Sequence, residues 1–188
     1  MVFSLGINVF LDFKKEEIMA ESFKKYPLSC SGVSVWKIED GPECVVTPFS
    51  CFRDFVIRLR KEYPENEYLS DARLDCYRPF STFTERKQIA YVAVEIERPM
   101  GVAIGYVSGR ESFYLQYLIS DPAGYSGRCT SMIFGRMMAD FRRITCSISI
   151  FEKDARKKAI AHYCERFGFH IEPGSSYGGD FLFMVWNV

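Results

Sequence analysis

The sequence has few of the side chains that hold metals, because its 188 residues include only two histidines. Seven cysteines are present, but no two of them form a C-x-x-C pair, so a zinc cluster has little support. An odd number of widely spaced cysteines also argues against a disulfide framework. We therefore expect reduced thiols, no metal site and a cytoplasmic location.

The chain also lacks net charge and the strongest catalytic motifs. Its 24 basic and 24 acidic residues balance, so net charge would not recruit nucleic acid or anionic lipid. One local basic patch is conceivable, from Arg142 and Arg143 with residues 156–158, although such runs are more often solvated helix ends. The absence of G-x-S-x-G, P-loop and G-x-G-x-x-G patterns removes the main evidence for a serine hydrolase, an NTPase or a dinucleotide oxidoreductase.

The N-terminal segment lacks the features of a secretory leader or a membrane span. It reads MVFSLGINVFLDFKK, in which Asn8 and Asp12 interrupt the apolar run and no early basic region or small-residue cleavage site occurs. We expect no membrane partner. Residues 1–32 are interpreted as an extension, with a strand followed by a short amphipathic helix over Lys14–Tyr26.

What the chain does have is the composition of an ordinary globular domain. Apolar residues make up 48% and charged residues 26%, which excludes a disordered tail. The aromatic share of 16% suits either a well-filled core or an aromatic-lined pocket, and does not separate the two. No repeat or linker divides the sequence, so we expect one domain over residues 1–188.

The first half contains one clear helix. Val33–Val46 is predicted to be a hairpin that turns at residues 39–42. Over Ser50–Tyr63 apolar residues recur at helical spacing, and Pro64 would end this helix. Residues 64–86 carry no regular pattern and are interpreted as a long loop, a kind of segment that often acts as a functional lid.

The second half is more regular. Three strands are predicted at Gln88–Glu97, Gly101–Val107 and Ser112–Ser120, and the short links between them, at residues 98–100 and 108–110, imply an antiparallel meander. The elements expected after them are a turn at Asp121–Ser131, a helix through Phe134 and Phe141, a strand at Ile144–Ile150, a helix at Ala155–Phe167 with Asp154 as N-cap and Gly168 at its end, and strands at Phe169–Ile171 and Phe181–Trp186. This order predicts an α/β (α+β) fold with a mixed, mostly antiparallel central sheet flanked by helices.

The turn that begins at Asp121 is the strongest candidate for a ligand site. Unpaired backbone amides at a helix N-terminus and the helix dipole together favour phosphate without any lysine. Small residues in the turn, such as Gly124 and Gly127, allow a ligand to approach the backbone closely. The alternative is a Gly-rich connection between a strand and a helix, with no ligand.

Two segments carry a resemblance to a known family. YLISDPAGYSGRCTSMIFGRM resembles the coenzyme A motif of Gcn5-related N-acetyltransferases (GNAT), in which a strand ending near Asp-Pro is followed by R/Q-x-x-G-x-G/A. KKAIAHYCERFGFHIEP is similar to the helix of that family that ends in a Tyr and, a few residues later, Leu-Gly-Phe. The resemblance implies a GNAT-like fold, with an acyl-CoA-binding half over residues 88–186. It also implies acetyl-CoA, or another acyl-CoA, as co-substrate.

The resemblance also implies the cofactor-binding residues. The backbone near Leu118 and Ile119 would pair with the pantetheine arm. Ser126 stands at the Arg/Gln position of the motif, and Cys129 and Ser131 occupy the two small positions that are usually Gly. The residues expected to bind the phosphates are Ser126, Gly127, Arg128, Cys129, Thr130 and Ser131.

In this family an acceptor amine attacks the thioester directly, and a Tyr on the last helix protonates the leaving thiolate. An alignment without a gap places Cys164 at that position, whereas a slip of one residue places Tyr163 there, and a phenol is the family's usual donor. Asp121 is the candidate for proton acceptor, directly or through water. Both Tyr163 and Cys164 also lie on the apolar stripe of their helix, so a purely structural role is the alternative for each.

The leading hypothesis is therefore an acyl-CoA-dependent N-acyltransferase, acetyl first among the acyl groups, acting on an amine of a small molecule, peptide or protein. A second hypothesis is a GNAT-fold binding module that has lost catalysis and acts through a macromolecular partner. A third is a transferase with an unusual acceptor, such as charged tRNA or a nucleobase, which would need a clustered basic face. Acceptor identity and oligomeric state, including a homodimer, are left open.

Overall fold

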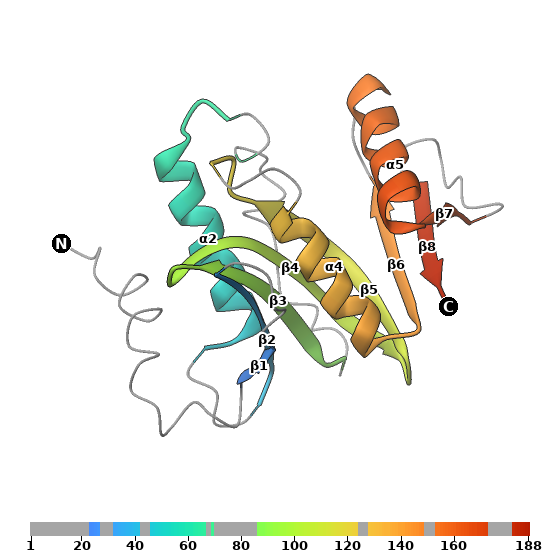
Figure 1. Cartoon of the computed structure of the whole chain (residues 1–188), viewed down its shortest axis with the longest axis horizontal. Helices are drawn as coiled ribbons and strands as arrows, with labels where there is room; N and C mark the ends of the chain where they lie inside the picture. The colour runs from blue at the N-terminus through green and yellow to red at the C-terminus, as the bar shows by residue number, and fades with distance from the viewer. Residues whose placement is uncertain are drawn as a thin grey trace.

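The structure of the chain, a computed structural model, describes residues 23–26, 32–41, 46–66, 69, 86–123, 128–148, 153–172 and 182–188. Its elements in chain order are β1 (Phe23–Tyr26), β2 (Val33–Glu39), α2 (Pro48–Glu62), β3 (Gln88–Glu95), β4 (Arg98–Gly109), β5 (Ser112–Ser120), α4 (Arg128–Asp140), β6 (Arg143–Ile148), α5 (Lys153–Phe167), β7 (His170–Ile171) and β8 (Leu182–Asn187). Figure 1 shows these strands as one curved sheet with helices on both faces.

The sheet has eight strands in the order β1-β2-β3-β4-β5-β6-β8-β7. Every pair of neighbours is antiparallel except β5 and β6, which run parallel. A parallel pair requires a crossover connection, which here is the turn after Asp121 followed by α4. The mixed, mostly antiparallel sheet predicted from the order of elements is confirmed.

Two hydrophobic cores lie on opposite faces of this sheet. Under α4, the core contains Ile133, Phe134 and Met137 of that helix, packed on side chains of the central strands. Under α2, the core contains Phe52, Phe55 and Leu59. The helix α5 covers the same face as α4, and the apolar stripe predicted on it contacts that core through residues Ile160, Tyr163, Cys164 and Phe167.

Local signals set the ends of two predicted helices. Thr47 caps α2, since its hydroxyl accepts from the Ser50 amide at 3.1 Å and the Ser50 hydroxyl accepts from the Thr47 amide at 3.0 Å. Pro48 at the first helical position is compatible with this start, so α2 begins before the predicted Ser50. Gly168 has a φ of +72°, as expected after the end of α5. Asp154 is not the N-cap, because α5 already includes Lys153.

The turn between β3 and β4 differs from its prediction. Residues 98–100 belong to β4, and the turn is formed by Ile96 and Glu97, with φ values of +47° and +65°. Two-residue hairpins need positive φ at both central positions and usually carry Asn or Gly there, so no turn signal is visible in these residues. Pro99 is tolerated in the strand, next to a register irregularity between Ala93 and Val94 in β3.

Two predictions in the first half need correction. Phe23–Tyr26, predicted as the end of a helix, is the edge strand β1, because it pairs with β2 and tertiary pairing outweighs local helical periodicity. The predicted hairpin over Val33–Val46 is confirmed only for β2, which pairs with β1 on one side and β3 on the other. Residues 42–45, in which the return strand was predicted, lie outside the described residues. The predicted N-terminal strand, and most of the predicted loop at 64–86, lie outside the described residues.

Within the described helices, no segment combines the length and the apolar character needed to cross a bilayer.

Candidate functional site

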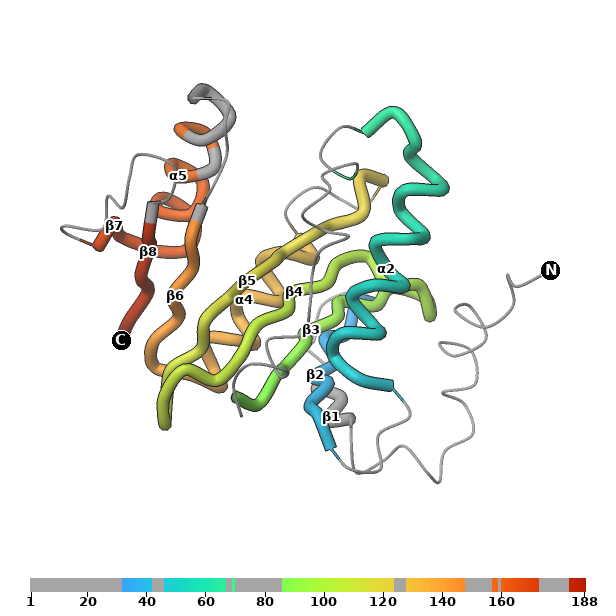
Figure 2. Tube along the Cα trace, turned by 180° about the vertical axis from the view of Figure 1, so that it is seen from behind, coloured from blue at the N-terminus to red at the C-terminus, as the bar shows by residue number. Residues whose placement is uncertain are grey.

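The strands β5 and β6 begin side by side and then separate, as both views of the molecule show (Figures 1 and 2). Their parallel pairing runs from Ser112 opposite Arg143 to Leu115 opposite Cys146. Beyond this point β5 stays paired with β4, but β6 pairs only with β8. The β6-facing edge of residues 118–120 therefore has no strand partner in the described part of the chain, and a V-shaped divergence opens between the two strands.

A β-bulge lies where the divergence begins. Gly105 of β4 is opposite Leu115, but the preceding Ile104 is opposite Tyr117, so Gln116 is an extra residue in β5. As a result Leu115 faces the core under α4, whereas Tyr117 packs against the core under α2. A bulge bends its strand and increases the local twist, which is consistent with β5 turning away from β6 here.

Gly105 is required at this bulge for steric reasons. A Cβ at this position would lie 2.0 Å from the Tyr114 carbonyl oxygen and 2.7 Å from Phe113 Cζ. No side chain fits without moving the β5 backbone away from β4. The shape of the divergence therefore depends on one glycine opposite the bulge.

The first turn of α4 lies at the open end of the divergence. The hydroxyl groups of Ser120, at the end of β5, and Thr130 are 2.9 Å apart and hydrogen-bonded. Arg166 of α5 donates through Nε to the Ser131 hydroxyl at 3.2 Å. These contacts join the end of β5, the start of α4 and the end of α5 around one opening.

The structure brings most of the predicted cofactor residues together there. Leu118 is partly buried against the core under α4, and Ile119 against the core under α2. Four of the predicted phosphate-binding residues form the first turn of α4, namely Arg128, Cys129, Thr130 and Ser131. Cys129 is buried, and this burial raises the pKa of its thiol, so its side chain serves packing. Ser126 and Gly127 lie outside the described residues.

The two candidate acids lie near the closed end. The Tyr163 ring meets Phe134 and Phe169 edge to face, with ring centroids 5.5 and 5.6 Å apart. Burial raises the pKa of the Tyr163 phenol far above its ordinary value, with a smaller contribution from Cys146. Burial, and then the neighbouring Cys164, raise the pKa of Cys146 to about 12. Both candidates pack against the core that contains Cys146, the last β6 residue paired with β5.

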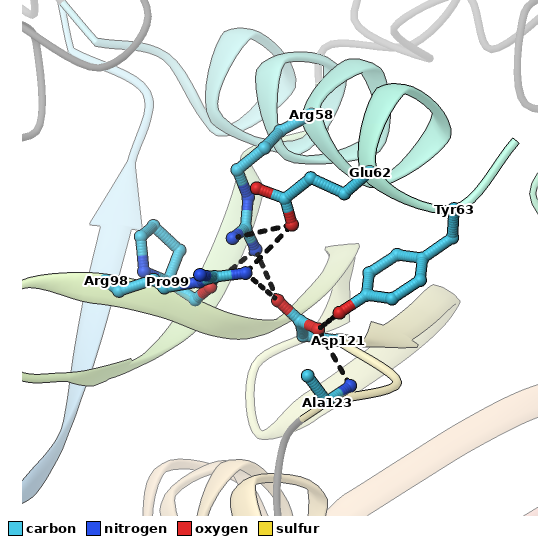
Figure 3. A network of polar contacts seen from close by, with 7 residues as sticks. All are labelled: Arg58, Glu62, Tyr63, Arg98, Pro99, Asp121 and Ala123. Atoms are coloured by element: carbon cyan, nitrogen blue, oxygen red, sulfur yellow. Dashed lines mark hydrogen bonds and ion pairs between the residues drawn. The ribbon is translucent and has the colours of Figure 1, made fainter.

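Asp121, the third catalytic candidate, lies at the other end of β5 inside a network of hydrogen bonds (Figure 3). Its side chain is 0% exposed. Its Oδ2 accepts from Nη2 of Arg58 and from Nη2 of Arg98, each at 3.1 Å. Its Oδ1 accepts from the Tyr63 hydroxyl at 2.8 Å and from the Ala123 amide at 2.9 Å. Both oxygens are thus occupied by partners.

The electrostatics of Asp121 follow from these contacts. Burial by itself would raise its pKa, but hydrogen bonds from Tyr63, the Ala123 amide and Arg98, together with the charge of Arg58, outweigh it and lower the pKa. A general base needs a pKa near the working pH and a free lone pair within reach of the substrate. Asp121 instead has the geometry of a fixed anion, which argues against the proton-acceptor role that its sequence position suggested.

The sequence did not identify the partners of Asp121. Arg58, Tyr63 and Arg98 are 23 to 63 residues away from it along the chain. In the sequence, Tyr63 is the last apolar position of a predicted helix, and Arg98 lies in a predicted turn. No local pattern connects such residues, because they meet only after the sheet forms.

The two halves of the conceivable basic patch lie in different elements, which agrees with the favoured interpretation of solvated helix and strand ends. Arg142 pairs with Glu111 at 3.4 Å, and Arg143 pairs with Glu172 at 2.9 Å. Both arginines lie at the start of β6, whereas residues 156–158 belong to α5, which follows the other end of that strand.

As for metals, no three His, Cys, Asp or Glu side chains converge on a possible ion site in the ranges that the structure describes.

Comparisons with known proteins bear on the fold. No protein-family model and no curated protein matches the sequence. Among solved structures, the chain is similar to an acetyltransferase from Streptococcus agalactiae 2603, with a TM-score of 0.54 and 18% identity over 85% of this chain and 100% of that one. The N-acetyltransferase PseH from Campylobacter jejuni has a TM-score of 0.48 and 10% identity, over 84% of this chain and 99% of that one. An acetyltransferase from Thermus thermophilus also has a TM-score of 0.48, with 16% identity over 76% of this chain and 94% of that one. At 18% identity it is the fold that the first of these structures shares with the chain, and the predicted GNAT-like fold is confirmed by it.

Proposed function

We propose that this chain, which has a GNAT-like acetyltransferase fold, is an acyl-CoA-dependent N-acyltransferase. The observation that carries the proposal is the divergence of β5 from β6 beyond Leu115 and Cys146, with the first turn of α4 at its open end. An exposed strand edge can pair with an amide-containing arm, and a helix N-terminus attracts phosphate. Acyl-CoA carries these two groups in sequence, so it fits the divergence end to end.

This match between acyl-CoA and the divergence predicts the orientation of the bound co-substrate. Its phosphates would rest at the start of α4, on the amides of residues 126–131, with Arg128 as a charged partner. Its pantetheine arm would run along Leu118 and Ile119. The thioester would then lie near Gln116, at the closed end of the divergence, where α5 brings Tyr163 and Cys164 close to β6.

Bound acyl-CoA would supply a thioester that the acceptor amine attacks, and the chain would hold and protonate the leaving group. Tyr163 is the proposed acid. Its raised pKa keeps the phenol protonated at neutral pH. The contacts of its ring are with aromatic side chains of the core. A thiolate formed in the same partly buried environment would also gain proton affinity, which offsets the raised phenol pKa.

Cys164 remains the second candidate for the acid. It is partly buried against the same core as Tyr163, and it is a free thiol. A cysteine S–H group is a weak donor and can take this role. Substitution of Tyr163 and of Cys164, one at a time, distinguishes the two candidates for the acid.

Asp121 takes a different place in this proposal. It lies five residues beyond Gln116, about 16 Å along an extended strand, and so near the phosphates and not the thioester. Its occupied oxygens are consistent with that distance from the chemistry. We propose that the acceptor amine loses its proton to water.

Three finer points belong to the same proposal. The acyl group is acetyl, the acceptor amine is on a small molecule, peptide or protein, and the protein is cytoplasmic without a membrane partner. A nucleic acid acceptor has less support, because the described basic segments are separated along β6 and two of their arginines pair with acids. A homodimer is compatible with the fold and is left to measurement.

The second candidate function is a binding module on this scaffold. One observation favours it: the Thr130 hydroxyl is hydrogen-bonded to that of Ser120 and the Ser131 hydroxyl accepts from Arg166, so both side chains of this turn already have protein partners. This candidate predicts no affinity for coenzyme A.

The experiment that separates the two is acetyl-CoA binding, followed by calorimetry and by the melting temperature. A ligand at about 100 times its Kd adds about 2.7 kcal/mol of stability, so millimolar acetyl-CoA should raise the melting temperature of the wild type. Ser131→Leu should weaken this binding, because a bulky side chain would fill the opening at the first turn of α4. The control is Gly135→Leu, one turn further along, where an added Cβ meets no atom within 4 Å. Wild-type protein that shows neither heat nor a shift at millimolar acetyl-CoA would exclude the transferase.

A further inference from the structure

The network around Asp121 joins three parts of the fold that are far apart in the chain. Arg58 comes from α2, and Tyr63 is the residue that caps the C-terminal end of that helix. Arg98 comes from the first residue of β4, beside the exposed hairpin turn. Ala123 belongs to the turn that leads from β5 to α4. All four donate to one carboxylate, as Figure 3 shows.

The network is balanced in charge. Two guanidinium groups face two carboxylates, since Glu62 also contacts Arg58 at 3.5 Å and Arg98 at 2.8 Å. Arg58 donates in addition to the carbonyl oxygen of Pro99 at 2.7 Å. Removal of Arg58 would leave the buried Asp121 carboxylate with Arg98, which is half exposed, as its remaining cation, and this is unfavourable. The arrangement is therefore held as a unit.

Asp121 is the residue through which this unit acts on the turn. Its amide donates to the Met100 carbonyl at 2.8 Å, which ties its backbone to β4. Its side chain holds the Ala123 amide, two residues further on, and at the same time the end of α2. The first residues of the turn before α4 are thus fixed relative to the sheet and to α2 together.

We propose that Asp121 is a positioning residue for the acyl-CoA site, and that Tyr63, Arg58 and Arg98 act through it. The network fixes the position of the first residues after β5, which lead to the first turn of α4. In the proposal this keeps the phosphate-binding amides at the open end of the β5–β6 divergence. This inference rests on the proposed function for the identity of the ligand. It makes α2, on the opposite face of the sheet, a part of the co-substrate site.

The chain offers a matched pair of variants for the test. Tyr63 donates to Asp121 at 2.8 Å, and Tyr91 donates to Asp140 at 2.8 Å at the C-terminal end of α4. Each of these two variants, Tyr63→Phe and Tyr91→Phe, removes the hydroxyl that donates to one aspartate. Only Asp121, the partner of Tyr63, lies at the start of the turn that leads to the proposed site. We expect Tyr63→Phe to raise the KM and the Kd for acetyl-CoA about threefold to tenfold, which is a part of the net worth of one hydrogen bond to a charged group, with kcat within about twofold. Tyr91→Phe should leave all three constants unchanged.

A second measurement does not need the ligand. Hydrogen–deuterium exchange of peptides covering residues 121–131 should be faster in Tyr63→Phe than in wild type, and unchanged in Tyr91→Phe. Equal exchange and equal Kd in both variants, with a wild type that binds acetyl-CoA, would overturn the positioning role and leave the transferase in place. A fall in kcat with an unchanged KM would also overturn it, because it would place Asp121 in the chemistry.

The remaining outcomes are distinguishable as well. A wild type that does not bind acetyl-CoA overturns the proposed function and the positioning role that rests on it. If Tyr63→Phe shows no cooperative melting, Arg98→Lys serves in its place, because that side chain is 48% exposed and keeps its charge while losing the guanidinium geometry. The same rise in KM at constant kcat is expected from it, and an unchanged KM counts against the inference.

Discussion

At the scale of single residues, burial and hydrogen bonding change what Asp121 and Tyr163 can do. Both were candidates because of their places in a motif, and a motif carries no information about surroundings. The fold gives Asp121 four donors, which hold it ionised, and gives Tyr163 an apolar environment, which holds it protonated. One residue therefore suits the role of a fixed anion and the other the role of a proton donor.

The Tyr163→Phe variant tests the proposed acid. A general acid contributes on the order of 10²–10⁴ in rate, so kcat should fall about a hundredfold or more while the KM for acetyl-CoA changes little. The ring and its contacts with Phe134 and Phe169 are kept, so the melting temperature should stay close to that of wild type. The measurement is steady-state release of free coenzyme A. Cys164→Ser is the companion variant, and loss of activity in it with full activity in Tyr163→Phe would assign the acid to Cys164.

The lowered pKa of Asp121 predicts a dependence of stability on pH. Its folded pKa lies below the unfolded value of about 3.9, so its contribution is present above that pH and is lost as the pH falls through the folded pKa. The free energy of unfolding of wild type should exceed that of Asp121→Asn at pH 7, and the difference should shrink below about pH 4. Urea unfolding at a series of pH values measures this. A difference that stays constant with pH would show that the charge of Asp121 does not contribute.

At the scale of elements, hydrophobic periodicity located the helices better than the turns. The stripe over Ser50–Tyr63 and the stripe around Phe134 both lie in helices that pack on the sheet. The hairpin turn was misplaced because Ile96 and Glu97 adopt positive φ without Asn or Gly. Phe23–Tyr26 was misassigned because an edge strand is defined by its partner, β2, and not by its own pattern.

Gly105→Ala tests the bulge as an element of the site. The added Cβ would lie 2.0 Å from the Tyr114 carbonyl oxygen, so β4 and β5 must move apart. Overpacking of this kind costs about 1–3 kcal/mol, and it should also weaken acetyl-CoA binding because it changes where β5 leaves β6. Gly135→Ala is the control, since a Cβ there meets no atom within 4 Å and should stabilise an exposed helix position. Equal unfolding free energies for the two variants in urea would show that the bulge tolerates a side chain.

At the scale of the whole molecule, the site is a product of topology. The parallel pairing of β5 with β6 stops at Leu115 and Cys146. The end of β5, the start of α4 and the end of α5 surround the opening beyond this pair, and these segments are not all neighbours in the sequence. α5 closes one side of this opening, and its Arg166 reaches the first turn of α4. The α2 helix contributes from the opposite face through Asp121.

The sequence by itself determined the order of elements from residue 88 onward, the mixed sheet and the place of the turn before α4, because periodicity, short links and small residues are local properties. It also singled out Leu118, Ile119 and the first turn of α4 as one site through a resemblance in motif. Only the tertiary structure decided how the turn that begins at Asp121 is held. Its partners Arg58, Tyr63 and Arg98 come from 23 to 63 residues away, and long-range hydrogen bonds leave no periodic trace in a sequence. The bulge at Gln116 was equally hidden, since the extra residue exists only relative to the register of β4.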